Sequence, residues 1–305
     1  MNAEETVDEG TVTAARRRGK VLAGLRGALQ LAAVTLFTAY FLKTFVVEAF
    51  RIPSSSMENT LLVGDFIMVN KFQYGAKTPA TLPFTTIPLP QIRFPAVSPP
   101  RRGDVMVFRF PGERDQPAPV PPVTYVKRCI GLPGDTIRII DKQVTINGWE
   151  VAPAGTVKTS PDRLYPAGFV DHRIFPRGYP FNEDNYGPLV VPHRGMRITL
   201  DPARLPEWWS VVEREGHEVA LTAQGVILVD GAPATSYEVR QDHYFVMGDN
   251  RDNSLDSRFW GFVSDDRLVG KAMMLYWSWD VSGPRQGPFG RFSSIRWDRV
   301  GRIIR

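Results

Sequence analysis

The pattern of apolar positions begins with one long segment near the N-terminus. Gly27–Leu42 contains sixteen residues without a charged side chain, and the apolar character continues past Lys43 and Glu48 to Phe50. A helix needs ~20 mostly apolar residues to cross a bilayer, and long charged side chains near its end can reach the interface. The pattern over 27–50 therefore predicts a transmembrane helix. A buried core helix is the alternative, whereas a cleaved signal peptide is disfavoured because no small-residue cleavage site follows.

The charges around this segment predict its orientation. Basic side chains precede it at Arg16, Arg17, Arg18, Lys20 and Arg26. Because basic flanks favour the cytoplasmic side of a span, we expect a cytoplasmic N-terminus and translocation of everything after Phe50. Residues 1–15 are polar, and we expect them to form a loose tail. No second apolar run of comparable length follows, so the pattern predicts a single span with a large exported domain.

After the span, short runs of β-branched and aromatic residues predict strands separated by turns. The two dipeptides Asn147-Gly148 and Asp230-Gly231 are strong hairpin signals. The predicted strands cover residues 65–72, 104–110, 123–130, 136–140, 143–146, 149–151, 226–229, 243–247, 267–270 and 272–277.

Three stretches lack this strand pattern. Residues 78–100 hold many prolines and almost no charge, which predicts a long surface loop. Residues 152–220 are irregular, although 205–215 could form a short helix with Pro206 in its first turn. The tail over 295–305 combines basic residues with Trp297. Two interpretations stay open, because such a tail can lie on anionic lipid headgroups or extend into solvent.

These patterns predict a mostly β protein with an N-terminal transmembrane helix. The predicted organisation is a cytoplasmic tail (1–26), an anchor (27–50), a β-rich core (51–151 and 221–280), an inserted region (152–220) and a C-terminal tail (281–305).

Composition and charge exclude several classes of protein. The 305 residues allow about two domains at ~150 residues each. Glycine and proline occur 26 times each, which favours turns and strands over long helices. A single cysteine excludes an intramolecular disulfide and a multi-cysteine zinc site. The net charge of +5 comes without the basic and aromatic clustering of a nucleic-acid-binding protein, so we expect no nucleic-acid partner.

Most familiar catalytic motifs are absent from the sequence. There is no G-x-S-x-G elbow and no H-E-x-x-H zinc motif. The run 249–253 resembles a calcium loop, but Arg251 stands where that loop needs Asp or Asn. The four histidines lie outside any nucleophile motif, although a dispersed Ser-His-Asp triad stays open. They are His172, His193, His217 and His243.

Two other features could carry hydrolytic chemistry together. Ser54-Ser55-Ser56 follows Pro53 directly beyond the span, where a polar linker is the simple interpretation. Lys127 lies in the strand over 123–130, on the face that also carries Tyr125 and Cys129. A lysine there could extend to water, but burial would lower its pKa and leave a neutral amine able to deprotonate a serine.

Four motifs, taken in order, resemble the conserved boxes of type I signal peptidases. Their order after a membrane anchor makes the resemblance specific, and it runs from Ile52 to Gly261 with 152–220 outside it. The motifs are Ile52-Pro53-Ser54-Ser55-Ser56-Met57 with Thr60-Leu61 and Gly64-Asp65; Arg102-Gly103-Asp104-Val105 with Val107-Phe108; Tyr125-Val126-Lys127-Arg128 with Gly131-Leu132-Pro133-Gly134-Asp135; and Gly248 to Ser254 with Asp256 to Gly261.

The resemblance implies roles for individual residues. Ser56 matches the nucleophile and Lys127 the general base. Ser54 matches the side-chain donor of the oxyanion hole, beside the N–H of Ser56, and Ser254 matches the hydroxyl that orients the lysine. Tyr125 belongs to the lysine box. The remaining matches are supporting residues, for which we expect a salt-bridge network that braces the site: Asp249, Arg251, Asp256 and Arg258.

The resemblance also implies the signal peptidase fold, no metal or organic cofactor, and pre-proteins with signal peptides as substrates. The expected location is the bacterial plasma membrane, with the catalytic domain on the exported side and the bilayer as a partner. Two alternatives stay open. One is a serine-lysine peptidase dedicated to a single export or conjugation system. The other is a non-enzymatic, membrane-anchored β-domain.

Overall fold

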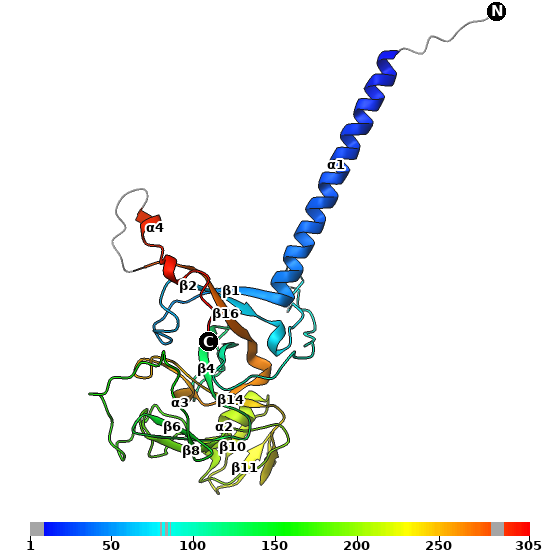
Figure 1. The fold of residues 1–305 in the computed structure, drawn as a ribbon. Helices are drawn as coiled ribbons and strands as arrows, with labels where there is room; N and C mark the ends of the chain where they lie inside the picture. Colours follow the sequence, from blue (N-terminus) through cyan, green and yellow to red (C-terminus); the bar gives the residue numbers. More distant parts are fainter. Residues whose placement is uncertain (1–8, 80, 83–84, 86, 282–289) are drawn as a thin grey trace, which may run out of the picture.

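The computed structural model describes residues 9–305, except residue 80, residues 83–84, residue 86 and residues 282–289. A long N-terminal helix extends away from a β-rich body (Figure 1). Helix α1 covers Glu9–Phe41 and continues through the π-helical turn η1, Leu42–Val46. Helix thus begins within the segment that was expected to be a loose tail, while residues 1–8 lie outside the described part.

The segment Leu22–Val46 is long and apolar enough to cross a bilayer, and its apolar window has no buried residue. Exposed side chains such as Leu31, Leu36 and Phe37 would be unfavourable in water, so they are consistent with the predicted span and exclude a buried core helix. The helix ends four residues before the predicted end at Phe50, because Val47–Arg51 form strand β1.

The main sheet has seven strands in the order β1-β2-β16-β3-β4-β14-β15. Neighbouring strands of this sheet run antiparallel wherever the register of the pair is defined. The bounds are β1 Val47–Arg51, β2 Asp65–Asn70, β3 Val105–Arg109, β4 Thr124–Gly131, β14 His243–Met247, β15 Val263–Ser264 and β16 Leu268–Ser278.

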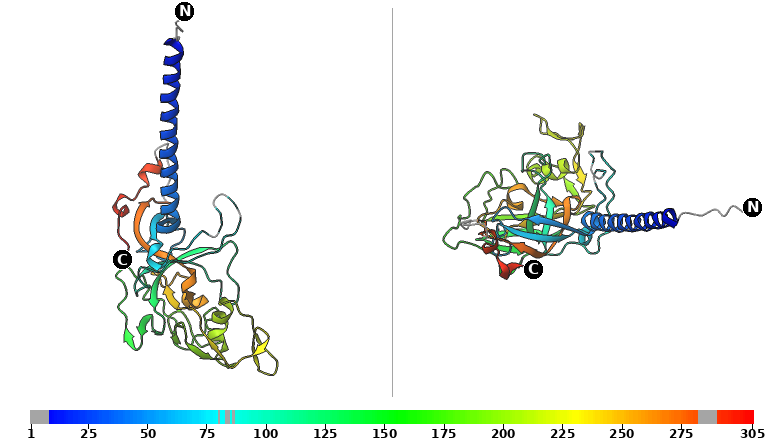
Figure 2. Two further views of the ribbon diagram at one scale, coloured as in Figure 1. Left: turned by 90° about the vertical axis from the view of Figure 1, so that its right-hand side faces the viewer. Right: turned by 90° about the horizontal axis from the view of Figure 1, so that it is seen from above.

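Smaller sheets occupy the end of the body farthest from α1 (Figures 1 and 2). Four strands follow the order β7-β6-β5-β8, three the order β10-β11-β12, and β13 pairs with β9. Their bounds are β5 Thr136–Ile140, β6 Gln143–Ile146, β7 Trp149–Glu150, β8 Tyr186–Val190, β9 Arg197–Thr199, β10 Val219–Leu221, β11 Ile227–Val229, β12 Ala232–Pro233 and β13 Ser236–Glu238.

Helices are short outside α1. They are α2 Leu205–Arg214, α3 Ser257–Trp260 and α4 Gly290–Ser293, with 3₁₀ turns η2 Phe72–Tyr74, η3 Asp265–Arg267 and η4 Trp297–Arg299. The mostly β prediction is therefore confirmed, including the short helix expected over 205–215. Both predicted hairpins are present, and Asn147 and Gly148 adopt the positive φ values of 54° and 85° that their turn requires.

The segment predicted as an insertion takes part in the sheets. Its strand β8 pairs with β5, so residues 186–190 complete the four-stranded sheet. Lys158 forms a parallel bridge with Asn250, which places the segment beside the fourth motif. The sequence pattern of this segment does not predict these strands, because they are short and separated by long turns.

The C-terminal residues pack against the main sheet and are not a solvated tail. Ile303 bridges to Met274 of β16, and the neighbouring Ile304 is buried in the core. Arg299 is buried as well, and it donates two hydrogen bonds to the Asp65 carboxylate, of 2.6 and 3.2 Å, at the start of β2. This buried ion pair fixes the end of the described chain beside the segment that precedes β2.

Replacing Arg299 by alanine should therefore destabilise the body. Breaking a buried ion pair from one side typically costs ~3–5 kcal/mol. We expect about 3 kcal/mol, at the lower end of that range, because Arg296 Nη1 remains 3.7 Å from Asp65. Thermal or denaturant unfolding would measure the loss. The control is Arg197→Ala, which removes an exposed pair with Glu238 and should change little. Equal stability of the two variants would contradict this role of Arg299.

Candidate active site

The three serines lie on a turn that is held at both ends. Ile52 before them and Met57 after them are buried, whereas Ser54 is exposed and Ser56 half-buried. The carbonyl of Ser56 accepts a hydrogen bond from the N–H of Asn250, of 3.1 Å. The burial of the flanking apolar side chains and this backbone contact fix the hydroxyls at the surface of a cleft.

Lys127 reaches the same point from the main sheet. It lies in β4 opposite Met106 of β3, and only 4% of its surface is exposed. Its Nζ donates a hydrogen bond of 2.7 Å to Ser56 Oγ and one of 3.3 Å to the carbonyl oxygen of Val126. The structure thus brings together a serine and a lysine that are 71 residues apart in the sequence.

Burial lowers the pKa of Lys127 to about 8. The cause is loss of hydration of the ammonium, which outweighs the opposing attraction of Asp256 and Asp249. At pH 7 about a tenth of the amine is therefore neutral, far more than in a solvated lysine.

The other hydroxyls differ in their surroundings. Ser54 Oγ lies 3.5 Å from Ser56 Oγ. Ser55 Oγ accepts a hydrogen bond of 3.1 Å from Asn253 and is thus held by a different partner. Ser254 Oγ is buried and, among the described residues, makes no hydrogen bond, to Lys127 or otherwise. The contacts thus single out Ser56 as the serine bonded to the lysine.

Gly248 is packed between Ser254 and the serine turn. A Cβ added to Gly248 would lie 2.2 Å from Ser254 Oγ and 2.5 Å from the carbonyl oxygen of Ser56. Only a residue without a side chain allows this approach of the fourth motif to Ser56.

The supporting residues form two buried ion pairs. Arg128 donates to both carboxylate oxygens of Asp249, at 2.7 and 2.6 Å. Arg258 does the same to Asp256 at 2.9 Å each. Arg251 has no carboxylate within ion-pair distance among the described residues and donates from Nε to the carbonyl oxygen of Gly248. The network thus includes Arg128, to which the sequence patterns gave no role.

Arg128 could have been found from its position. It neighbours Lys127 on the opposite face of the strand, and an arginine inside a buried strand needs a carboxylate partner. Thr60 also donates its hydroxyl to Asp249, so the serine motif, the lysine strand and the fourth motif meet at this carboxylate.

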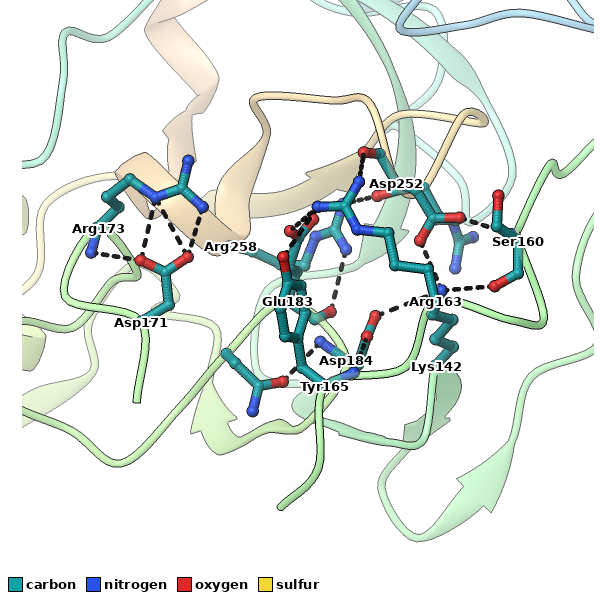
Figure 3. A network of polar contacts seen from close by, with 12 residues as sticks. Lys142, Ser160, Arg163, Tyr165, Asp171, Arg173, Glu183, Asp184, Asp252 and Arg258 are labelled. Atoms are coloured by element: carbon teal, nitrogen blue, oxygen red, sulfur yellow. Dashed lines mark hydrogen bonds and ion pairs between the residues drawn. The ribbon is translucent and has the colours of Figure 1, made fainter. Parts of the chain in front are cut away.

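Polar contacts from residues 142–184 hold the fourth motif from the other side (Figure 3). Asp252 accepts hydrogen bonds of 2.7 Å from Lys142 and 2.5 Å from the N–H of Ser160. Arg258 donates to the carbonyl oxygen of Glu183, whose carboxylate pairs with Arg163. The segment expected to be an insertion therefore braces the fourth motif at Asp252 and at the supporting residue Arg258.

A cavity of about 370 Å³ opens at Ser56. One side is the serine turn with Phe50, and the other is the β4 segment with Tyr125 and Lys127. Leu255 adds a further apolar wall.

Cys129 does not line this cavity, although it is the next residue after Lys127 on the same face of the strand. Burial also raises the pKa of its thiol, so Cys129 is a poor nucleophile. The described residues include no cluster of metal-ligating side chains.

Comparisons with known proteins identify the family of this chain. A family model described as signal peptidase, peptidase S26, matches residues 25–277. Signal peptidase I of Pseudomonas aeruginosa is 33% identical over 85% of this chain and 74% of its own. That of Pseudomonas fluorescens is 36% identical over the same shares, and that of Aquifex aeolicus 31% over 81% and 82%.

A solved signal peptidase I from Enterococcus faecalis is 23% identical and covers 58% of this chain and 98% of its own, with a TM-score of 0.26. The chain belongs to the signal peptidase family, peptidase S26, and is a serine peptidase of that family. The matched range includes residues 152–220, which were expected to lie outside the resemblance.

Gly248→Ala should damage the site more than the fold. The added methyl group collides with Ser254 and the Ser56 carbonyl, and a displacement near 1 Å can reduce turnover on the order of 100-fold. Peptidase activity and thermal unfolding would be measured together. Gly155→Ala is the matched control, because nothing lies within 4 Å of its added Cβ. Full activity of Gly248→Ala would show that the site tolerates a methyl group between Ser254 and the Ser56 carbonyl, against this prediction.

Proposed function

We propose that this chain removes N-terminal signal peptides from exported pre-proteins, with Ser56 as the nucleophile and Lys127 as the general base. The observation that carries the assignment of residues is the 2.7 Å contact between Lys127 Nζ and Ser56 Oγ at a buried lysine. Family membership supports the reaction, because the relatives are signal peptidases.

The reaction begins with proton transfer. Neutral Lys127 takes the proton of Ser56 Oγ, and the oxygen attacks the carbonyl carbon at the end of the signal peptide. Negative charge then develops on the carbonyl oxygen. Ser54 Oγ and the N–H of Ser56 are the proposed donors to that oxygen, and one such donor can contribute ~3–4 kcal/mol.

In the next step Lys127 acts as a general acid. Its ammonium returns the proton to the leaving amine, which releases the mature protein and leaves an acyl group on Ser56. A water molecule deprotonated by the same amine hydrolyses this ester. Ser254 is proposed to orient the lysine, because its buried hydroxyl has no other hydrogen-bond partner among the described residues.

The anchor brings enzyme and substrate to the same surface. We propose that Leu22–Val46 crosses the bacterial plasma membrane with the N-terminus in the cytoplasm and the β-rich body on the exported side. Four basic residues, Arg16, Arg17, Arg18 and Lys20, precede the segment, and Arg26 lies near its N-terminal end; these charges support this orientation. Substrate and enzyme would then diffuse in two dimensions, with the cleavage site held near the membrane.

Ser56→Ala and Lys127→Ala should each abolish cleavage of a pre-protein while the fold persists. The double variant should be barely worse than either single one, because the two residues act as a unit. Cleavage would be followed by gel electrophoresis with the protein in detergent, and circular dichroism would check the fold. Ser55→Ala is the matched control and should retain most activity, since Ser55 Oγ is bonded to Asn253. Substantial cleavage by Ser56→Ala would move the nucleophile to another residue.

A panel of pre-proteins separates general from dedicated processing. Cleavage of several unrelated signal peptides supports the proposal. Cleavage of only one would indicate a serine-lysine peptidase of a single export system, and cleavage of none by a folded protein would indicate a non-enzymatic domain.

The pH dependence should report the titration of Lys127. The pKa of this lysine is lowered to about 8, and only the neutral amine is a base, so activity increases as the pH rises through that value. We expect an ascending limb of kcat/KM with a midpoint near pH 8. Lys77 is a matched control, because burial lowers its pKa to about 8 as well, yet it lies outside the cavity at Ser56. Lys77→Gln should leave the limb in place. A limb near the solution pKa of lysine, ~10.4, would rule out Lys127 as a buried base.

A further inference from the structure

A second cavity lies beside the active site and shares no lining residue with the cavity at Ser56. Its volume is about 610 Å³. The turn between β5 and β6 forms one wall, residues 150–159 a second, and the end of β4 with Arg102 and Arg251 a third. Neither Ser56 nor Lys127, the proposed catalytic residues, lines this cavity.

Arg251 distinguishes the cavity from an ordinary surface hollow. Only 7% of the residue is exposed, yet its Nε bonds to a backbone carbonyl and no carboxylate lies within ion-pair distance among the described residues. The other cations of the lining are paired, Arg102 with Asp135, Arg128 with Asp249 and Lys142 with Asp252. The pKa of Arg251 is lowered to about 10 by burial, so the guanidinium still carries its charge near neutral pH.

Asp256 and Asp249 attract the Arg251 guanidinium only from beyond ion-pair distance, and both carboxylates are already paired with Arg258 and Arg128. The charge of Arg251 is therefore only partly compensated, and an anion supplied from outside would relieve the cost of its burial. The rest of the lining limits what the anion can be. Asp141 and Glu150 also face the cavity and would repel a ligand with several negative charges. Apolar side chains line much of the remainder, among them Ile130, Val144 and Val157.

We propose that this cavity binds a ligand with a single carboxylate on an apolar body, and that the carboxylate lies on the Arg251 guanidinium. Arginine and carboxylate match in geometry and can form two parallel hydrogen bonds. A fatty acid and the C-terminus of a short apolar peptide share this chemistry. The site is separate from the proposed catalytic residues, so its occupancy does not depend on the peptidase mechanism.

Calorimetric titration of the full chain in detergent tests the proposal. The probes are octanoate with octanol as its uncharged match, and N-acetyl-Leu-Leu with its C-terminal amide. We expect at least one carboxylate to bind at one site per chain, at least tenfold more tightly than its uncharged match. Binding of octanoate alone identifies a fatty acid, binding of the peptide alone identifies a peptide C-terminus, and binding of both indicates that the carboxylate and apolar bulk suffice.

Three variants locate the bound carboxylate. Arg251→Gln should weaken binding at least tenfold, and Ala154→Trp should weaken it by filling the cavity without altering Arg251. Glu150→Gln should strengthen binding about twofold, because it removes a repelling charge near the carboxylate. Should Arg251→Gln fail to fold, the Ala154→Trp result decides.

Unchanged affinity in a folded Arg251→Gln variant would overturn the proposal, and so would any of three other results. The first is that neither carboxylate binds. The second is that the uncharged matches bind equally well. The third is that Ala154→Trp binds with unchanged affinity, which would place the ligand in the cavity at Ser56 or in the detergent.

Discussion

Removing the amine of Lys127 from water is the constraint on which the active site depends. A lysine in water holds its proton at neutral pH, whereas the buried Lys127 has a pKa near 8. The body must therefore enclose this side chain and still leave Ser56 open to a substrate. Lys127 is enclosed within β4, whereas the half-buried Ser56 lies on a turn between buried Ile52 and Met57 and opens to the cavity.

Keeping the lysine buried requires that neighbouring charges be neutralised locally. The ion pairs of Arg128 with Asp249 and Arg258 with Asp256 do this within the core. They also tie β4 to the fourth motif, which in turn holds the Ser56 carbonyl through Asn250. Removing one partner would leave an uncompensated charge close to the amine, so these residues affect both the stability of the body and the pKa of Lys127.

The sequence predicts this site better than it predicts the architecture around it. The candidate residues lie in short motifs, so Ser56 and Lys127 could be proposed from the sequence alone, and the structure places their polar atoms 2.7 Å apart. The strands of the core followed from alternating and β-branched runs, because their side chains divide between a buried and an open face. By contrast, β8 is short and contains Gly187 and Pro188, so local pattern gives no strand signal. The partner of Arg128 was equally hidden, because Asp249 lies 121 residues away and only the fold brings them together.

The position of β16 has a consequence for how the protein matures. Strand β2 lies between β1, which directly follows the membrane segment, and β16, where Asn70 pairs with Lys271. Ile304 then closes the core under the same strands. During synthesis the serine turn emerges early, but the sheet that supports it stays incomplete until nearly the whole chain is available. The nascent chain therefore carries the serine turn before β16 and the ion pairs of Asp249 and Asp256, which surround Lys127, can form.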